Sequence, residues 1–243
     1  MKTLTLVNTD ELLATALSNY YDISNDGDIS NNVFIDWLCP KDNMEQIGVL
    51  EEAIKLGSYI VMFDRYQSLR QHEIDWLLRY KNVKLFEPSL ITRRGFKHMP
   101  FWYELYRFGD TVIEKTEDVG YVMDEKRPNI LYEYDLPLVG SYDKIKLTVV
   151  FGSEGEYNRG YLPDLKPIIY NRCLPLLPRK HKYFLSLFSG LIVDSKKDID
   201  WCVNVLRLYD VLIETIYELM DKYFPEMKVG NVANQINLAF QGR

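Results

Sequence analysis

Short apolar runs alternate with amphipathic segments through the first third of the chain. The apolar runs predict strands at residues 3–7, 33–38, 58–63 and 83–86. Between them, apolar residues recur at helical spacing in residues 12–17, 44–56 and 68–78. The almost continuous apolarity of the run at 58–63 is typical of a strand buried on both faces of a parallel sheet. This β-α-β-α-β-α-β order predicts a Rossmann-like parallel sheet over residues 1–90.

Local signals support the helix boundaries. Gly57 terminates the helix that begins at Met44. Ser68, followed three residues later by Gln71, forms a capping-box pattern that predicts a helix start. No Gly-x-Gly-x-x-Gly follows the first strand, so we do not expect a standard dinucleotide site in this half.

The alternation is interrupted at residues 92–108, which contain four Arg or Lys, one Glu and six aromatic residues. We interpret this segment as the crossover between two lobes, residues 1–110 and 111–243. In the second lobe, strands are predicted near 119–123, 130–134 and 145–151. Residues 160–194 predict a short helix, a buried strand, a basic loop and a further strand at 191–194. A long helix is predicted at 198–224, ended by Pro225, and a final helix at 232–240. The predicted fold is therefore α/β, with two Rossmann-like lobes and a long C-terminal helix.

Composition narrows the class of protein. The chain has 243 residues, 47% of them hydrophobic, and a formal net charge of −6. That charge argues against non-specific coating of DNA, although a local basic face is still compatible with it. No apolar run reaches the roughly 18 residues that span a bilayer, and the N-terminus lacks the features of a signal peptide. We therefore expect a cytoplasmic protein without membrane contact. The three cysteines and three histidines are widely spaced, so no metal site is expected.

A basic loop follows the predicted strand before residue 179. Arg179 and Lys182 lie in this loop, and Lys166 and Arg172 precede the strand. Open α/β sheets bind anionic ligands past the carboxyl ends of their strands, and phosphate oxygens favour charge-assisted donors. The pattern indicates a phosphate-binding site. The alternative is a solvated loop between two elements.

Two further candidates lie at the ends of predicted strands. Gly152 and Ser153 follow an apolar run and would let backbone N–H groups approach a ligand, although the Lys-Ser/Thr ending of a P-loop is missing. Asp64, next to Arg65, follows the strongest strand and is the candidate general base. Asp36 is a weaker candidate for that role. The alternatives are an ordinary turn for Gly152 and Ser153, and a helix cap or an Asp64–Arg65 loop contact for Asp64.

The segment 93–108 interleaves basic and aromatic side chains. Such patterns hold nucleic-acid phosphates and stack on bases, with Arg93 and Arg94 as the charged start and Phe101 and Trp102 among the rings. The alternative is that the segment packs between the two lobes, and the two roles are compatible with each other.

Two stretches give the chain a resemblance to a known class. Residues 58–87 contain Tyr-Ile-Val-Met-Phe-Asp-Arg-Tyr and Val-Lys-Leu-Phe-Glu, with Pro88 directly after. They resemble an acceptor-lobe βαβ unit of GT-B glycosyltransferases. Residues 165–194 contain Lys-Pro-Ile-Ile-Tyr-Asn-Arg-Cys-Leu-Pro-Leu-Leu-Pro and Gly-Leu-Ile-Val-Asp, and they resemble the helix and strands of a donor lobe. The chain is similar to small glycosyltransferases of tailed bacteriophages, some of which modify hydroxymethylated pyrimidines in DNA.

The resemblance implies transfer of a sugar from a nucleotide sugar, with a UDP-sugar favoured, to an acceptor hydroxyl, with DNA as a candidate acceptor. No other cofactor is implied, and the compartment would be the cytoplasm, that of the host for a phage protein. The implied catalytic base is Asp64. The implied donor-site residues are Gly152, Ser153, Tyr161, Lys166, Arg172, Arg179 and Lys182. The implied acceptor-site residues are Arg65, Arg93, Arg94, Phe101 and Trp102.

The sequence also departs from that class. Its members often place a Glu three residues after a position like Lys166 to hold the donor ribose, and here that position is Ile169. The chain is also short for two full lobes. Two other functions therefore stay open: a nucleotide-binding protein without catalysis, such as a phage regulator or ligand sponge, and a structural α/β protein whose basic loop contacts another protein.

Overall fold

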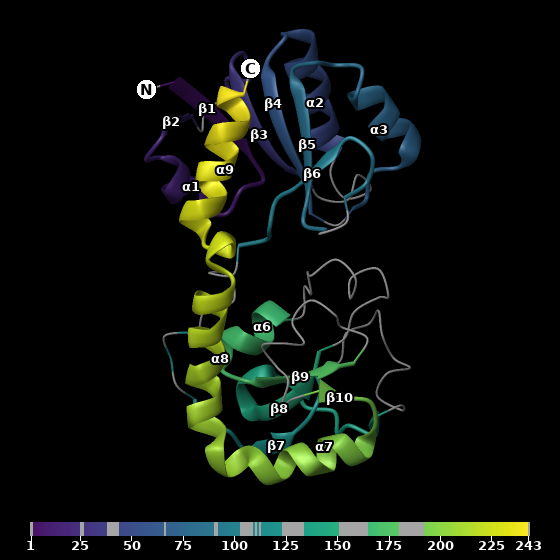
Figure 1. Cartoon of the computed structure of the whole chain (residues 1–243), viewed down its shortest axis with the longest axis vertical. Helices are drawn as coiled ribbons and strands as arrows, with labels where there is room; N and C mark the ends of the chain where they lie inside the picture. The colour runs from purple at the N-terminus through teal and green to yellow at the C-terminus, as the bar shows by residue number, and fades with distance from the viewer. Residues whose placement is uncertain are drawn as a thin grey trace. The chain divides into compact units, whose positions relative to one another are not determined.

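The computed structural model divides the chain into two compact units (Figure 1). The first contains residues 1–104 and 226–243, and the second contains residues 105–225. The expected lobe boundary assigned residues 226–243 to the second lobe, whereas the structure groups them with the first unit. The structure describes residues 2–24, 27–37, 44–65, 67–89, 92–102, 109, 111, 113–122, 134–150, 165–179 and 192–242.

The first unit is built on a parallel sheet of six strands in the order β2-β1-β3-β4-β5-β6. The strands are β1 (Lys2–Val7), β2 (Tyr21–Ser24), β3 (Asn32–Trp37), β4 (Tyr59–Asp64), β5 (Val83–Glu87) and β6 (Phe96–His98). The four strands predicted from apolar runs are confirmed. The short strands β2 and β6 were not predicted, because pairing with β1 and β5 defines them more than their own sequence does.

Helices cover both faces of this sheet. The helices are α1 (Glu11–Leu17), α2 (Met44–Lys55), α3 (Gln71–Leu77) and α9 (Val229–Gln241). Apolar residues of α2 and α3 pack with Val33, Ile35 and Met62, which alternate along β3 and β4 and so share one face. On the other face α9 lies beside α1 and contacts β4 (Figure 1). Coverage of both faces explains why all six residues of β3 are buried.

The helix start predicted at Ser68 differs from the observed one. Helix α3 begins at Gln71, and its N-cap is Arg70, whose backbone N–H donates to Glu73 Oε2 at 2.6 Å. Ser68 instead donates its backbone N–H to the Asp64 carboxylate at 2.9 Å. The predicted helix start was therefore wrong, because the buried Asp64 carboxylate, four residues before Ser68, accepts hydrogen bonds from this serine.

The second unit contains a smaller parallel sheet with strand order β10-β9-β8-β7. Its strands are β7 (Glu117–Val119), β8 (Ile145–Val149), β9 (Leu174–Pro178) and β10 (Ile192–Val193), and α6 (Leu165–Tyr170) precedes β9. The predicted order of helix, buried strand and further strand is confirmed here. The strand expected at 130–134 and most of the basic loop lie outside the described residues. Both units are thus α/β with parallel, Rossmann-like sheets.

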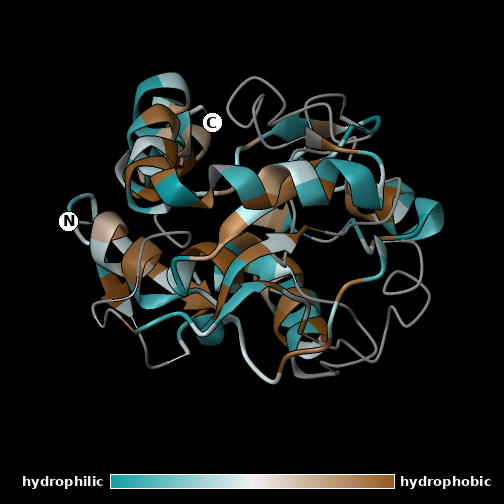
Figure 2. Cartoon of the chain, turned by 90° about the horizontal axis from the view of Figure 1, so that it is seen from below, coloured by the Kyte–Doolittle hydropathy of each residue, from teal (hydrophilic) through white to brown (hydrophobic). Residues whose placement is uncertain are grey.

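The long helix predicted at 198–224 is interrupted in the structure. It consists of α7 (Lys196–Val203), a 3-10 turn (Asn204–Leu208) and α8 (Tyr209–Tyr223). Helix α7 contacts β10, whereas α8 contacts β9. Both helices are amphipathic, and helix ribbons in Figure 2 carry brown and teal segments accordingly. Apolar periodicity predicts which face of a helix is buried. It does not predict where one helix ends and the next begins in order to pack on a different strand. The final helix, α9, is confirmed.

Candidate functional site

Three acidic residues lie at the carboxyl ends of adjacent strands in the first sheet. Asp36, Asp64 and Glu87 come from the ends of β3, β4 and β5, and each is 0% exposed. The carboxyl edge of an open α/β sheet is where such proteins bind ligands. Buried carboxylates require compensating partners. With Arg65 and Arg93, which supply that compensation, these residues are here termed the carboxyl-edge cluster.

Arg93 joins two of the carboxylates. Its guanidinium contacts Asp64 Oδ2 at 2.6 Å and Glu87 Oε2 at 2.7 Å, and its backbone N–H donates to Glu87 Oε1 at 2.5 Å. It also donates to the carbonyl of Leu69 at 3.0 Å and lies over the Phe96 ring, 4.2 Å from the centroid. The guanidinium is therefore fixed by contacts from several directions.

Asp64 is occupied by neighbours on both of its oxygens. Oδ1 accepts from the backbone N–H of Ser68 at 2.9 Å and from its hydroxyl at 3.3 Å. Oδ2 accepts from the backbone N–H of Leu69 at 3.2 Å and from Arg93. A general base needs an oxygen within reach of the substrate proton. In this arrangement Asp64 orders the loop after β4 and orients Arg93. The partner of Asp64 is thus Arg93 and not Arg65, the loop contact considered from the sequence.

Arg65 pairs with Asp36 rather than with Asp64. Its Nε donates to Asp36 Oδ1 at 3.1 Å, and a second guanidinium nitrogen contacts Oδ2. The guanidinium lies over two stacked rings, 4.7 Å from the centroid of Phe101 and 5.3 Å from that of Trp102. The ion pair and the aromatic stack together hold Arg65 at the carboxyl edge.

The two predicted base-stacking rings are in the interior. Phe101 is 3% exposed and Trp102 is 0% exposed, and both pack against Phe63. Neither presents a ring face to a nucleic-acid base in this arrangement, because both rings pack inside the first unit. Arg94 is exposed in the turn before β6. Basic and aromatic residues alternate both in segments that bind nucleic acid and in segments that pack inside a protein. The sequence pattern therefore does not distinguish these two roles.

Glu87 was not among the predicted site residues. The signal that singles out Asp64, an acidic residue ending an apolar strand, is also present at Glu87, which precedes Pro88. The same reasoning applied to every strand end therefore finds this residue.

The predicted donor-site residues are only partly described. Gly152, Ser153, Tyr161 and Lys182 lie outside the described residues. Lys166 is exposed on α6. Arg172 precedes β9 and pairs with Glu214 at 2.5 Å, whereas Arg179 follows β9 and pairs with Asp194 at 2.6 Å. A five-residue strand spans about 17 Å, so the structure places these two arginines at opposite edges of the sheet.

A cavity of about 440 Å³ lies at the amino edge of the second sheet. Its lining includes Lys115, Arg172 and Tyr209. Lys115 donates to the carbonyls of Tyr142, at 3.2 Å, and Asn171. Desolvation lowers the pKa of this half-buried lysine. Lys115 was missed because a lone lysine before a short strand carries no sequence signal.

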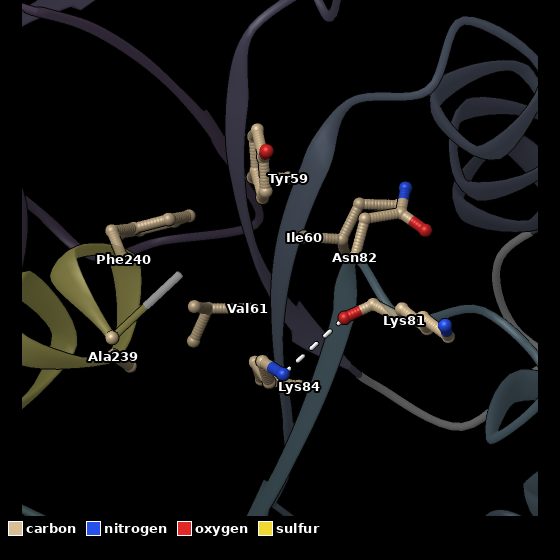
Figure 3. Close-up of a pocket in the computed structure, with 9 residues that line it drawn as sticks. Tyr59, Ile60, Val61, Lys81, Asn82, Lys84, Ala239 and Phe240 are labelled. Atoms are coloured by element: carbon tan, nitrogen blue, oxygen red, sulfur yellow. Dashed lines mark hydrogen bonds between the residues drawn. The ribbon is translucent and has the colours of Figure 1, made fainter.

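A second cavity, of about 310 Å³, lies between α9 and the sheet of the first unit (Figure 3). Phe240 and Ala239 line it from α9, and Val61 lines it from β4. Lys81 and Lys84 add polar groups near the start of β5, where Lys84 Nζ donates to the Lys81 carbonyl at 3.3 Å. This cavity is at the amino end of β4, the end opposite to the carboxyl-edge cluster.

The fold and these contacts define an α/β protein with a charged cluster at the carboxyl edge of a parallel sheet. No protein-family model matches the chain, and no curated protein matches it either. Within the described ranges, no helix combines the length and apolarity needed to traverse a bilayer. Those ranges also contain no group of three or more His, Cys, Asp or Glu residues suited to a metal ion.

Proposed function

We propose that this chain is a glycosyltransferase of GT-B-like organisation, which moves a sugar from a nucleotide sugar to an acceptor hydroxyl. The observation that carries the proposal is the path of the chain. A first parallel-sheet unit is followed by a second, and the last helix, α9, returns to the first. This path agrees with the two-lobe organisation that the resemblance implies.

The charge of the carboxyl-edge cluster supports an uncharged, hydroxyl-bearing acceptor in the first unit. Three carboxylates and two guanidiniums give the cluster a formal charge of about −1 when all are ionised. A site with this balance does not attract the phosphates of nucleic acid, which bind to net cationic surfaces. Hydroxyl groups both donate and accept hydrogen bonds and fit a mixed cluster. Simple alcohols and sugars are therefore favoured over a hydroxymethylated pyrimidine in DNA, which is tested as the acceptor that the resemblance implies.

We assign the donor phosphates to the carboxyl edge of the second sheet. Among the described residues of the predicted donor site, Arg179 follows β9 there, and its side chain is 73% exposed although it pairs with Asp194. An exposed guanidinium at a strand end is available to phosphate oxygens and would stabilise negative charge on a departing diphosphate. Arg172, at the amino edge, contacts Glu214 and is assigned to packing in the second unit.

A nucleotide-binding protein without catalysis is the second candidate. The occupancy of Asp64 favours it, because both oxygens already accept hydrogen bonds and the carboxylate is 0% exposed. Transfer would then require a base from elsewhere, whereas binding would not.

The test combines binding and turnover. Thermal unfolding is measured with UDP-, GDP- and TDP-sugars, because a ligand that binds only the folded state raises the apparent stability by about 2.7 kcal/mol at 100 times its Kd. Release of the nucleotide is then followed with simple sugars and with hydroxymethylated DNA as acceptors. Sugar transfer supports the glycosyltransferase, binding without release supports the second candidate, and the absence of both contradicts the two proposals.

Matched variants locate the donor site. Arg179→Ala should weaken nucleotide affinity about tenfold, as expected for loss of a charge-assisted hydrogen bond. Arg172→Ala removes the same type of side chain from the opposite end of β9 and should leave the affinity unchanged. Equal effects of the two variants would contradict the assignment of the phosphates to the carboxyl edge.

A further inference from the structure

The strand order of the first sheet reverses between β1 and β3. From β1 the chain moves outward to β2, and it then returns to place β3 on the other side of β1. The connections after β1 and β3 consequently leave the sheet in opposite directions along its carboxyl edge. Open α/β sheets bind ligands in the crevice at such a reversal. The reversal point is separate from the predicted donor site, and it adjoins the carboxyl-edge cluster through β3.

Three buried polar atoms belong to residues at or just after the carboxyl ends of these two strands. They are Thr9 Oγ1, Asp10 Oδ2 and Trp37 Nε1, and none has a hydrogen-bond partner within the part of the chain that the structure describes. Trp37 is only 3% exposed. Val7 pairs with Ile35 in the parallel register, and this is the last pair between β1 and β3. Asn8, with φ +57°, then ends the extended conformation of β1. Thr9 and Trp37 each follow this last pair by two residues, at the same edge of the sheet. Asp10 follows directly as the N-cap of α1.

Unpartnered buried polar atoms are rare in native proteins, and a cluster of them calls for a partner that the chain itself does not supply. The other oxygen of Asp10 is already used, because Oδ1 accepts from the backbone N–H of Leu13 at 2.9 Å. The free groups are therefore a carboxylate oxygen that accepts, an indole N–H that donates, and a hydroxyl that does both.

We propose that the carboxyl edge of the sheet between β1 and β3 binds a vicinal diol of a sugar. One hydroxyl of a diol donates to Asp10, the other accepts from Trp37, and Thr9 exchanges a hydrogen bond with either. A phosphate does not fit, because it offers only acceptors and would be repelled by the Asp10 carboxylate. An apolar group would leave all three atoms unpaired. The choice of a sugar as the diol rests on the proposed function, but the binding itself does not require transfer.

Conservative variants of these three residues test the site. Thr9→Val removes the hydroxyl with little change of shape, Asp10→Asn retains an oxygen for the Leu13 cap, and Trp37→Phe removes the N–H. The matched control is Thr148→Val in the second unit, since Thr148 Oγ1 is also buried and unpartnered among the described residues. If Trp37→Phe does not fold, the other two variants still test the proposal.

The probes are UDP-glucose, uridine, 2′,3′-dideoxyuridine and methyl α-D-glucopyranoside, with affinity measured by titration calorimetry and ligand-observed NMR. We expect Thr9→Val and Asp10→Asn to weaken binding of a diol-bearing probe about three- to tenfold, with no effect of Thr148→Val. If Thr9→Val weakens the binding of uridine but not that of 2′,3′-dideoxyuridine, the bound diol is that of the ribose. If Thr9→Val weakens the binding of methyl α-D-glucopyranoside, the bound diol is that of the hexose.

The proposal is overturned if no probe binds, or if every probe binds the Thr9 and Asp10 variants as tightly as the wild type. These outcomes are separable from failure of the proposed function. Variant-sensitive binding without nucleotide release retains the diol site and rejects sugar transfer. Transfer with variant-insensitive binding rejects the diol site alone.

Discussion

At the residue scale, the carboxyl-edge cluster depends on Arg93, which lies between two carboxylates of different strands. Asp64 and Glu87 are 0% exposed, whereas the Arg93 side chain is 26% exposed. A buried ion pair contributes little net stability compared with an apolar replacement, but loss of one partner leaves an uncompensated buried charge. The main contribution of Arg93 is thus to compensate the buried charges of Asp64 and Glu87.

Arg93→Ala should therefore lower the free energy of unfolding by about 3 kcal/mol, near the lower end of the range for broken buried pairs because the guanidinium is partly solvated. Arg94→Ala is the control, since Arg94 is exposed in the same turn, and its effect should stay within about 0.5 kcal/mol. Both are measured by chemical denaturation. Equal losses for the two variants would show that the carboxylates do not depend on Arg93.

A second prediction at this scale concerns pH. Burial, with a contribution from the charge of Asp198, raises the pKa of Cys202 to about 11. The folded state thus keeps the thiol proton at a pH where the unfolded chain, with a thiol pKa of about 8.5, has released it. The associated stability is complete below the unfolded pKa and is lost as pH rises through the folded value.

The free energy of unfolding should accordingly decline between pH 9 and pH 11, and less steeply in Cys202→Ala. Tyr209 acts in the same direction because burial raises its pKa, and Lys115 acts in the opposite direction because burial lowers its pKa. Tyr209 and Lys115 are present in both the wild type and Cys202→Ala, so the difference between their two slopes reports Cys202 alone. An unchanged slope in the variant would contradict the shifted thiol. Denaturation at fixed pH values provides the measurement.

At the element scale, the turn between β5 and β6 sets the position of Arg93. The backbone N–H of Phe96 donates to the Arg93 carbonyl at 3.0 Å, and Gly95 within this turn has φ +88°. A Cβ at Gly95 would lie 2.6 Å from Leu78 Cδ1. The turn therefore depends on a residue without a side chain, because positive φ strains other residues.

Gly95→Ala should destabilise the protein by about 1–2 kcal/mol, the cost of a left-handed conformation for an L-residue. Gly48→Ala makes the same change inside α2, where a Cβ would meet nothing within 4 Å, and should stabilise by about 0.5–1 kcal/mol. Thermal or chemical unfolding gives both values. Effects of the same sign would exclude the role assigned to the Gly95 backbone.

At the scale of the whole molecule, the chain closes its first unit with its last helix. Val232, Ile236 and Phe240 of α9 are buried, with Phe240 edge-on to Tyr21 at a centroid distance of 5.8 Å. The Tyr21 hydroxyl also donates to Asn237 at 2.8 Å. A sheet face formed by the first residues of the chain is thus covered by some of the last.

Phe240→Ala should cost about 3–5 kcal/mol, as for other buried aromatic truncations. Leu238→Ala on the same helix is the control, because Leu238 is 55% exposed and its truncation should change stability by at most about 0.5 kcal/mol. Hydrogen exchange should show the loss of protection in β1 and α1. Loss confined to the second unit would refute the grouping of α9 with the first.

The sequence predicts only part of the candidate site. The sequence marks Asp64 and Asp36 as strand-end carboxylates, but it does not show that Arg93, 29 residues after Asp64, is the partner that occupies Asp64. It marks Phe101 and Trp102 as aromatic without showing that they are buried. Partners distant in the sequence are chosen by packing, which a local pattern does not encode.

The sequence by itself determined the order of β1, α1, β3, α2, β4, α3 and β5 and the existence of α9. Burial on both faces of a parallel sheet imposes apolar runs, and burial of one helix face imposes periodicity. Tertiary structure alone decided the short strands β2 and β6, the break between α7 and α8, and the positions of Arg172 and Arg179 at opposite ends of β9. It also decided the partners of the buried charges. These features depend on contacts between segments that are far apart in the chain. The free energy of such a contact depends on both segments, so the sequence of either one alone does not predict it.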